Sequence, residues 1–193
     1  MPPDETVWCA DPHTVAKQRI YRKYFQAWFP IVQQGFDCGA TYAEGFAGPG
    51  EYKNGHSGSP LNAVSAALRC ARPPSRDRPV GFVFIEARKD RVDHLNGLLR
   101  RELNTLDDGS LADRGVRLSV VKGKCEEDLP GALNVQRSWG RPLLVVLDTW
   151  GAGVSYRLLK KIGSMRSSEV IVTFEPQHFV RFASHPEHFG DSI

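Results

Sequence analysis

Residues 41–52 read TYAEGFAGPGEY, an apolar run that ends on an acid and then turns through three glycines within six positions. The acid is Glu44, and the glycines are Gly45, Gly48 and Gly50. Glycines at this spacing let a backbone turn with positive φ or approach another group closely. Many tight loops share this composition, so the rest of the chain has to show what the turn approaches.

Five short apolar runs have the character of buried strands, at residues 40–46, 79–86, 116–121, 142–148 and 169–174. Their apolar residues are continuous rather than alternating, which is typical of strands covered on both faces. Between them lie helix-like segments, at about residues 60–71, 88–103, 126–137 and 154–164. Strands that alternate with helices predict an α/β fold with a parallel sheet and right-handed crossovers.

A further helix is predicted before the first strand, in HTVAKQRIYRKYFQAWFPIV (residues 13–32), where apolar residues recur at helical spacing. Pro30 predicts a kink or a stop near its end. Four cations fall mostly off the apolar stripe: Lys17, Arg19, Arg22 and Lys23. They form either a solvated face or a basic face for phosphate or for an acidic ligand group.

Composition sets the broad class. A chain of 193 residues predicts one domain, with an N-terminal helical segment at 1–35 and an α/β core at 40–180. The net charge of +3 permits a nucleic-acid partner without arguing for one. No apolar run approaches the ~20 residues that span a bilayer, and the N-terminus lacks the plan of a signal peptide. The four cysteines form no CxxC pair, which favours reduced thiols and a cytoplasmic location.

Acids stand at the ends of several predicted strands. Glu86 ends the second strand and Asp148 ends the fourth, while the third runs into KGKCEED (residues 122–128). Ligands of such sheets bind at the carboxyl ends of the strands, where the strand order reverses. A glycine-rich loop after the first strand and an acid after the second are typical of dinucleotide or adenosyl sites, in which the acid accepts both ribose hydroxyls.

The sequence after the glycine turn favours one of these ligands. The segment EYKNGHSG (residues 51–58) delays the next helix, for which Ser59 and Pro60 are the predicted N-cap and first helical residue. This delay disfavours a pyrophosphate, which has to meet a helix N-terminus. Glu44, directly before the turn, suits a cationic ligand such as the ammonium and sulfonium of S-adenosylmethionine.

Two levels of resemblance support this ligand. AEGFAGPGEY (residues 43–52) is similar to the D-x-F-A-G-x-G motif of many nucleic-acid methyltransferases. More closely, the chain resembles the three-Cys-motif partner family over residues 8–180. The segments that carry this resemblance are HTVAKQRIYRKYFQAWFPIV, YAEGFAGPGEY, GSPLNAV, FVFIEARKDRVDHL and LVVLDTWG. That family is methyltransferase-like and is associated with a separate radical-type protein that carries three cysteines.

The resemblance implies a Rossmann-like methyltransferase fold with strand order 3-2-1-4-5 and S-adenosylmethionine as cofactor. The implied cofactor-binding residues are Glu44, Gly45, Ala47, Gly48, Gly50, Glu86, Ala87, Lys124, Cys125 and Asp148. Asp148 and Trp150 are the implied catalytic residues, which would orient a methyl acceptor on nucleic acid. The chain has Asp148-Thr149-Trp150-Gly151 where the family has D-P-aromatic-G. The alternative function is therefore a non-catalytic partner module that keeps the fold.

The end of the chain carries two further expectations. The methyltransferase fold usually adds two strands after the fifth, so that the end at Ile193 indicates a shortened chain or a minimal variant. An edge left uncovered would favour a homodimer. His178, His185 and His188 with Glu187 match no common zinc spacing, so no metal site is expected there.

Three smaller groups each allow two interpretations. Cys125 is a nucleophile or, more simply, a small residue packed near the adenine ring. The acids at 126–128 are a catalytic pair or the first-turn acids of a helix. His13 and Lys17 either cover the cofactor pocket or act as a cap and a surface cation.

Overall fold

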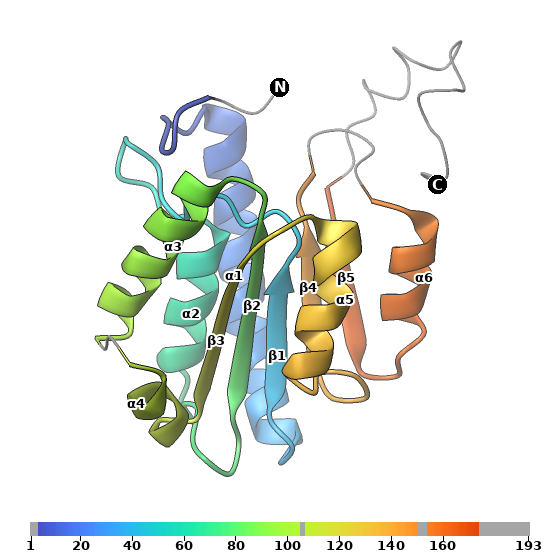
Figure 1. The fold of residues 1–193 in the computed structure, drawn as a ribbon. Helices are drawn as coiled ribbons and strands as arrows, with labels where there is room; N and C mark the ends of the chain where they lie inside the picture. The colour runs from blue at the N-terminus through green and yellow to red at the C-terminus, as the bar shows by residue number, and fades with distance from the viewer. Residues whose placement is uncertain (1–3, 105–106, 150–153, 174–193) are drawn as a thin grey trace.

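A five-stranded parallel sheet forms the centre of the molecule (Figure 1). The structure is a computed structural model that describes residues 4–104, 107–149 and 154–173. The strands are β1 (Ala40–Glu44), β2 (Val80–Glu86), β3 (Val116–Lys122), β4 (Leu143–Leu147) and β5 (Ser168–Val172). They run in the order β3-β2-β1-β4-β5, and every neighbouring pair is parallel. The predicted α/β class, Rossmann-like topology and strand order are confirmed.

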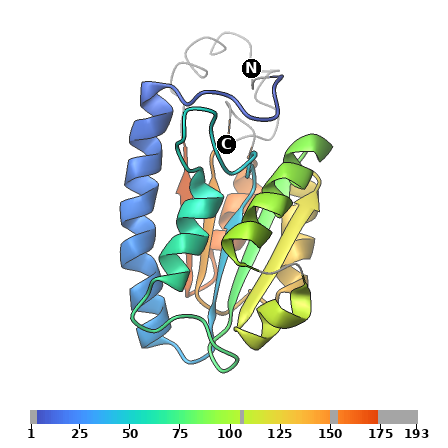
Figure 2. The same ribbon diagram turned by 90° about the vertical axis from the view of Figure 1, so that its left-hand side faces the viewer.

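Helices cover both faces of the sheet, as the crossovers predict (Figures 1 and 2). On one face lie α1 (Pro12–Gly35), α2 (Ser59–Leu68) and α3 (Lys89–Glu102); α5 (Cys125–Val135) and α6 (Tyr156–Gly163) lie on the other. A short helix, α4 (Asp108–Asp113), precedes β3 and was not predicted. The change of face after β3 places the reversal of strand order between β1 and β4.

Burial on both faces explains the continuous apolar runs. Every residue of β1, β2 and β4 is buried. Aromatic side chains fill the layer beneath α1 and α2, where Phe29, Tyr42 and Phe82 pack together with ring centroids 6.2–6.5 Å apart. Smaller aliphatic residues, Ala43, Val83 and Val145 among them, meet α5 and α6. The two faces thus have cores of different composition.

The N-terminal helix begins as the sequence suggests but ends later. Asp11 caps it, since its Oδ1 accepts a hydrogen bond from the backbone N–H of Thr14 at 2.7 Å. A stop at Pro30 is wrong, because α1 continues to Gly35. Val32 and Gln33 are buried in the turn beyond the proline. Tertiary packing therefore helps the helix to continue past a proline that local propensity disfavours.

The edges of the sheet differ from its centre. β5 is half-exposed along its length, and 40% of Val172 is accessible to solvent. The predicted dimerisation through an uncovered edge stays a prediction.

None of the helices in the described part of the chain is both long enough and apolar enough to cross a bilayer.

Candidate functional site

A cavity of about 530 Å³ lies at the carboxyl ends of the strands. Its walls come from the segments that follow β1, β2, β3 and β4, together with α1 and the residues before it. This is the reversal point of the strand order, where ligands of doubly wound sheets bind. The volume falls within the range of about 300–1,000 Å³ that small-molecule sites occupy.

Most residues singled out from the sequence meet at this cavity. Those that line it are Gly45, Ala47, Gly48, Gly50, Glu86, Ala87, Lys124, Cys125 and Asp148. Glu44 is not part of the lining. Trp150 lies outside the described residues. The fold therefore joins parts of the chain that are up to about a hundred positions apart into one wall.

The glycine turn has two glycines with positive φ and different surroundings. Gly48 has φ +64° and Gly50 has φ +85°. A Cβ built on Gly50 would lie 2.6 Å from Leu95 Cδ1, so a core side chain occupies the space beside Gly50. A Cβ on Gly48 would meet, among the described residues beyond its neighbours, only Trp8 Cη2 at 3.9 Å. Gly48 thus leaves open a space that a ligand could fill.

Glu86 joins the ends of β1 and β2 through its carboxylate. Oε2 accepts a hydrogen bond from the Gly48 backbone N–H at 3.0 Å, and Oε1 accepts one from the Arg88 backbone N–H at 2.9 Å. The residue is 8% exposed and lines the cavity. A carboxylate has about four acceptor positions, so each oxygen retains a position for a ligand hydroxyl.

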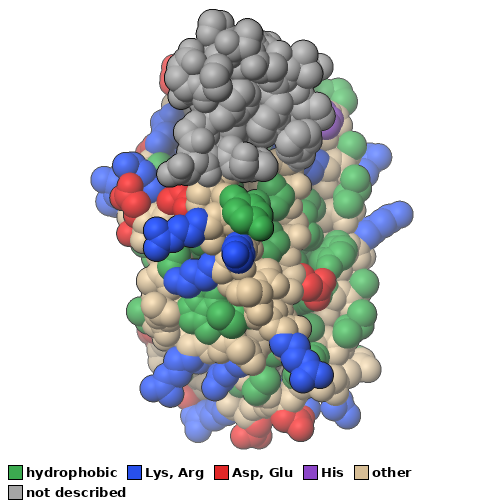
Figure 3. Space-filling model, turned by 90° about the vertical axis from the view of Figure 1, so that its right-hand side faces the viewer, with side chains coloured by type: hydrophobic (Ala, Val, Ile, Leu, Met, Phe, Trp, Pro, Cys, Tyr) green, Lys and Arg blue, Asp and Glu red, His purple; other side chains and the backbone are tan. Residues whose placement is uncertain are grey.

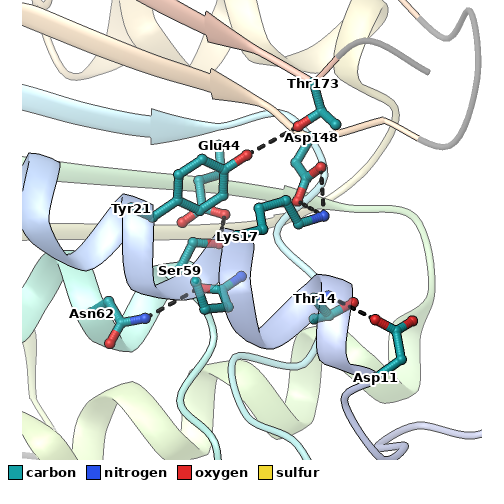
Figure 4. A network of polar contacts seen from close by, with 10 residues as sticks. Asp11, Thr14, Lys17, Tyr21, Glu44, Ser59, Asn62, Asp148 and Thr173 are labelled. Carbon is teal, nitrogen blue, oxygen red and sulfur yellow. Dashed lines mark hydrogen bonds and ion pairs between the residues drawn. The ribbon is translucent and has the colours of Figure 1, made fainter. Parts of the chain in front are cut away.

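Glu44 lies behind the cavity wall, unlike the expectation for a cation-binding acid (Figure 4). It is 1% exposed, and its Oε1 and Oε2 accept hydrogen bonds from Tyr42 Oη and Ser59 Oγ, both at 2.7 Å. Burial raises the pKa of Glu44 to about 8, although the two hydroxyl donors lower it. Burial thus favours the uncharged form of Glu44, so that its side chain supports the wall rather than supplying charge to it.

Ser59 explains why the predicted helix start was one residue late. Gly58 is the N-cap of α2, and Ser59 is the first residue of the helix. The Ser59 hydroxyl donates to Glu44 instead of capping the backbone. A buried acid thus redirects a side chain that sequence rules assign to the cap.

The raised pKa of Glu44 gives stability a pH dependence. Its pKa is about 8 in the folded protein and 4.5 ordinarily. Between these values the unfolded chain loses a proton that the folded chain keeps, so stability falls as pH rises, by up to ~1.4 kcal/mol per unit. Urea unfolding at several pH values should show this fall, and Glu44→Gln should flatten it. The exposed Glu102→Gln is the control; an unchanged slope in Glu44→Gln would contradict the prediction.

Lys17 places a cation at the end of β4 (Figure 4). Its Nζ lies 2.7 Å from Asp148 Oδ2 and donates a hydrogen bond to Oδ1 at 2.9 Å. The two side chains are 24% and 16% exposed, so this ion pair is partly shielded from water. Lys17 lines the cavity and His13 does not, and the interpretation that they cover a cofactor pocket stays a prediction. Nearby on α1, Tyr21 Oη and Thr173 Oγ1 share a hydrogen bond of 3.0 Å.

The segment before α1 closes one side of the cavity and was missed by sequence reasoning. Trp8 lines the cavity, with the Arg91 guanidinium 4.7 Å from its ring centroid and the Tyr52 ring edge-on at 5.6 Å. The Trp8 carbonyl accepts a hydrogen bond from the Lys53 backbone N–H at 2.9 Å. A lone tryptophan in a polar N-terminal segment was the available signal.

The surroundings of Cys125 and of the acids at 126–128 favour a structural role for each of these groups. A Cβ on Gly45 would lie 2.4 Å from Cys125 Sγ, so this thiol fills the space against the glycine turn. Burial raises the pKa of Cys125 to about 12, which disfavours a nucleophile. The acids at 126–128 are first-turn acids of α5. Asp128 Oδ2 accepts from the Lys124 backbone N–H at 2.8 Å, and Glu126 accepts from Ser155.

No group of three or more His, Cys, Asp or Glu side chains is placed to hold a metal ion within residues 4–104, 107–149 and 154–173. His178, His185, Glu187 and His188 lie outside these ranges.

Comparisons of the chain with protein-family models, with curated proteins and with solved structures found no match. Any functional proposal therefore rests on the geometry of the cavity.

Proposed function

We propose that the protein is an S-adenosylmethionine-dependent methyltransferase that acts on nucleic acid. The observation that carries the proposal is the pairing of Gly48 and Glu86 in one cavity wall. An open glycine backbone beside a carboxylate that ends the second strand suits an adenosyl ligand. Asp148, at the end of the fourth strand, completes the same wall.

The residues present fit this cofactor. The carboxylate of Glu86 would accept the ribose hydroxyls, and the open side of Gly48 would admit the ligand against the backbone. Ala87 and Cys125 offer small side chains where the adenine ring would pack. When bound, S-adenosylmethionine supplies an electrophilic methyl group.

Asp148 is the residue that we assign to the acceptor. Its carboxylate would accept a hydrogen bond from the N–H or O–H of the group to be methylated and hold it in line. Lys17 keeps the carboxylate in one orientation by contacting both of its oxygens. Most of the rate enhancement would come from this positioning.

Replacement of Glu86 tests the cofactor assignment. Charge-assisted hydrogen bonds contribute ~1.5–3 kcal/mol each, so Glu86→Ala should weaken S-adenosylmethionine binding about a hundredfold in calorimetry. Glu86→Gln keeps the size of the side chain and one acceptor oxygen, and should lose less. Glu51→Ala, in the segment between β1 and α2 and outside the cavity lining, is the control. Unchanged affinity in a folded Glu86→Ala protein would contradict the assignment.

A non-catalytic partner module is the second candidate, and one contact favours it. Both oxygens of Asp148 are already engaged by Lys17, which is also what a purely structural ion pair would show. In this function the fold would organise another protein, such as a radical-type protein with three cysteines. Methyl transfer by the wild-type protein distinguishes the two candidates.

A further inference from the structure

Two adjoining hollows run along α1 beside the cavity. They measure about 530 and 250 Å³ and lie between α1 and residues 56–70, with Arg22 and Ser57 in the walls of both. Figure 2 shows α1 and α2 side by side. We name these hollows the α1 groove, and its polar walls include Gln18, Arg19, Arg22, His56, Arg69 and Glu102.

The α1 groove is positively charged. Arg19, Arg22 and Arg69 are exposed, and Glu102 is the one acid in the described lining. In the described ranges none of these three arginines forms an ion pair with a carboxylate. The groove therefore carries guanidinium groups that are available to an anion.

One of these arginines is held in place by neutral groups. Arg22 Nε donates to Asn62 Oδ1 at 3.2 Å, and Asn62 Nδ2 donates to Gln18 Oε1 at 3.1 Å. Asn62 and Gln18 are both buried. This arrangement orients the Arg22 guanidinium along the groove and leaves its two terminal nitrogens for a bidentate contact of the kind that arginine makes with phosphate.

The groove leads to the end of the cavity where an acceptor would sit. Gln18 lines both the groove and the cavity. The preceding residue, Lys17, pairs with Asp148. A chain lying in the groove would thus reach the cavity beside Asp148.

We propose that the α1 groove binds the phosphodiester backbone of a single-stranded stretch of nucleic acid and delivers one base to the cavity. This inference rests on the proposed function and identifies where its substrate lies. A base inside a duplex is out of reach of such a cavity, so the strand has to be single or locally opened. Phosphates spaced along one strand match arginines spaced along the groove, with Arg19 and Arg22 on α1 and Arg69 at the end of α2.

Another basic surface provides the comparison. Figure 3 shows the face over α6, where Lys and Arg side chains are spread among hydrophobic ones. Arg157, Lys160 and Lys161 border a shallow hollow there, beside the exposed Tyr156. These residues lie on the opposite helical layer and share no wall with the cavity. Substitutions at these residues remove the same amount of charge at a distance from the groove, and they serve as the control.

Fluorescence anisotropy of a labelled single-stranded oligonucleotide tests the proposal, without cofactor and at several salt concentrations. Arg22→Gln combined with Arg69→Gln should weaken binding roughly tenfold at 100 mM salt and lower the salt slope by about 1.4. Arg157→Gln combined with Lys160→Gln should leave both unchanged. Absence of wild-type binding, or equal losses in the two double variants, would overturn the proposal.

Two further readouts separate this proposal from its alternatives. A labelled polyglutamate peptide that binds as tightly as the oligonucleotide would overturn the choice of nucleic acid. Calorimetry with S-adenosylmethionine should give the same affinity in wild type and in Arg22→Gln/Arg69→Gln. Loss of cofactor binding in all proteins, with oligonucleotide binding retained, would contradict the proposed function but not the groove.

The unmodified protein offers an independent test through its cysteines. Cys70 lines the groove and is half-buried, whereas Cys38 is exposed beyond the end of α1. Bound oligonucleotide should slow alkylation of Cys70 severalfold and leave Cys38 unaffected, as peptide mapping would show. Equal rates at Cys70 with and without saturating oligonucleotide would contradict the assignment.

Discussion

Gly48→Val is expected to abolish S-adenosylmethionine binding while the protein remains folded. Gly48 has φ +64° and presents its open side to the cavity. A branched side chain would fill the space that the ligand needs. Left-handed backbone also costs an L-residue roughly 1–2 kcal/mol, which would shift the Gly48 N–H away from Glu86. Calorimetry measures the loss, and circular dichroism checks the fold.

Gly55→Val controls for the backbone strain alone. Gly55 has φ +80°, and a Cβ there would have no heavy atom of the described residues within 4 Å beyond its neighbours. It lies between the bridged residues Glu51 and Ser57 and outside the cavity lining. Gly55→Val should therefore lose a similar amount of stability and keep its cofactor affinity. Normal binding by Gly48→Val would mean that the glycine turn serves the fold alone.

Asp148→Ala is expected to abolish methyl transfer to nucleic acid and to leave cofactor affinity nearly intact. In the proposed function its contact forms with the acceptor, so that its loss reduces turnover rather than cofactor binding. Transfer of a tritiated methyl group to bulk DNA and RNA measures turnover. Calorimetry on the same preparations measures affinity.

Lys17→Met is the matched variant for Asp148→Ala. It breaks the same ion pair but retains the carboxylate, and the long apolar side chain keeps much of the packing along α1. If Asp148 orients the acceptor, Lys17→Met should retain a measurable share of the activity. Equal loss in both variants would assign Asp148 a structural role through its ion pair. No transfer by a wild-type protein that binds cofactor well would favour the partner module.

The strands could be predicted because their burial is simple. Strands covered on both faces need no alternation, and the continuous runs at 79–86 and 142–148 matched β2 and β4 to within one residue at each end. The short helix α4 gave no comparable signal. It has six residues, of which only Leu111 is buried. Such a short segment cannot show the repeat of apolar residues by which a helix is predicted.

The site was predictable where it follows strand ends and unpredictable where distant segments meet. Glu86 is the last residue of β2 and Asp148 directly follows β4, and the topology alone brings them together. Trp8 meets Arg91 through contacts between segments more than eighty positions apart, such as the hydrogen bond of Thr6 to Asp90. No local pattern encodes such a meeting.

The sequence contained a pattern that predicts the orientation of Glu44, but another feature of the sequence pointed to a different role. Side chains two apart in a strand share a face, and Tyr42 Oη indeed donates to Glu44. The position of Glu44 before a glycine turn suggested a cation-binding acid instead. Burial at the centre of the sheet decided between them, since full desolvation favours the protonated form.

Calorimetric titration of the wild-type protein with S-adenosylmethionine, and then with its demethylated product, tests the central claim most directly. The account predicts that each ligand binds at one site per chain, in this cavity. Glu86→Ala and Gly48→Val should lower the affinity for both ligands. Failure of either ligand to bind the folded wild-type protein at millimolar concentration would contradict an adenosyl site in this cavity.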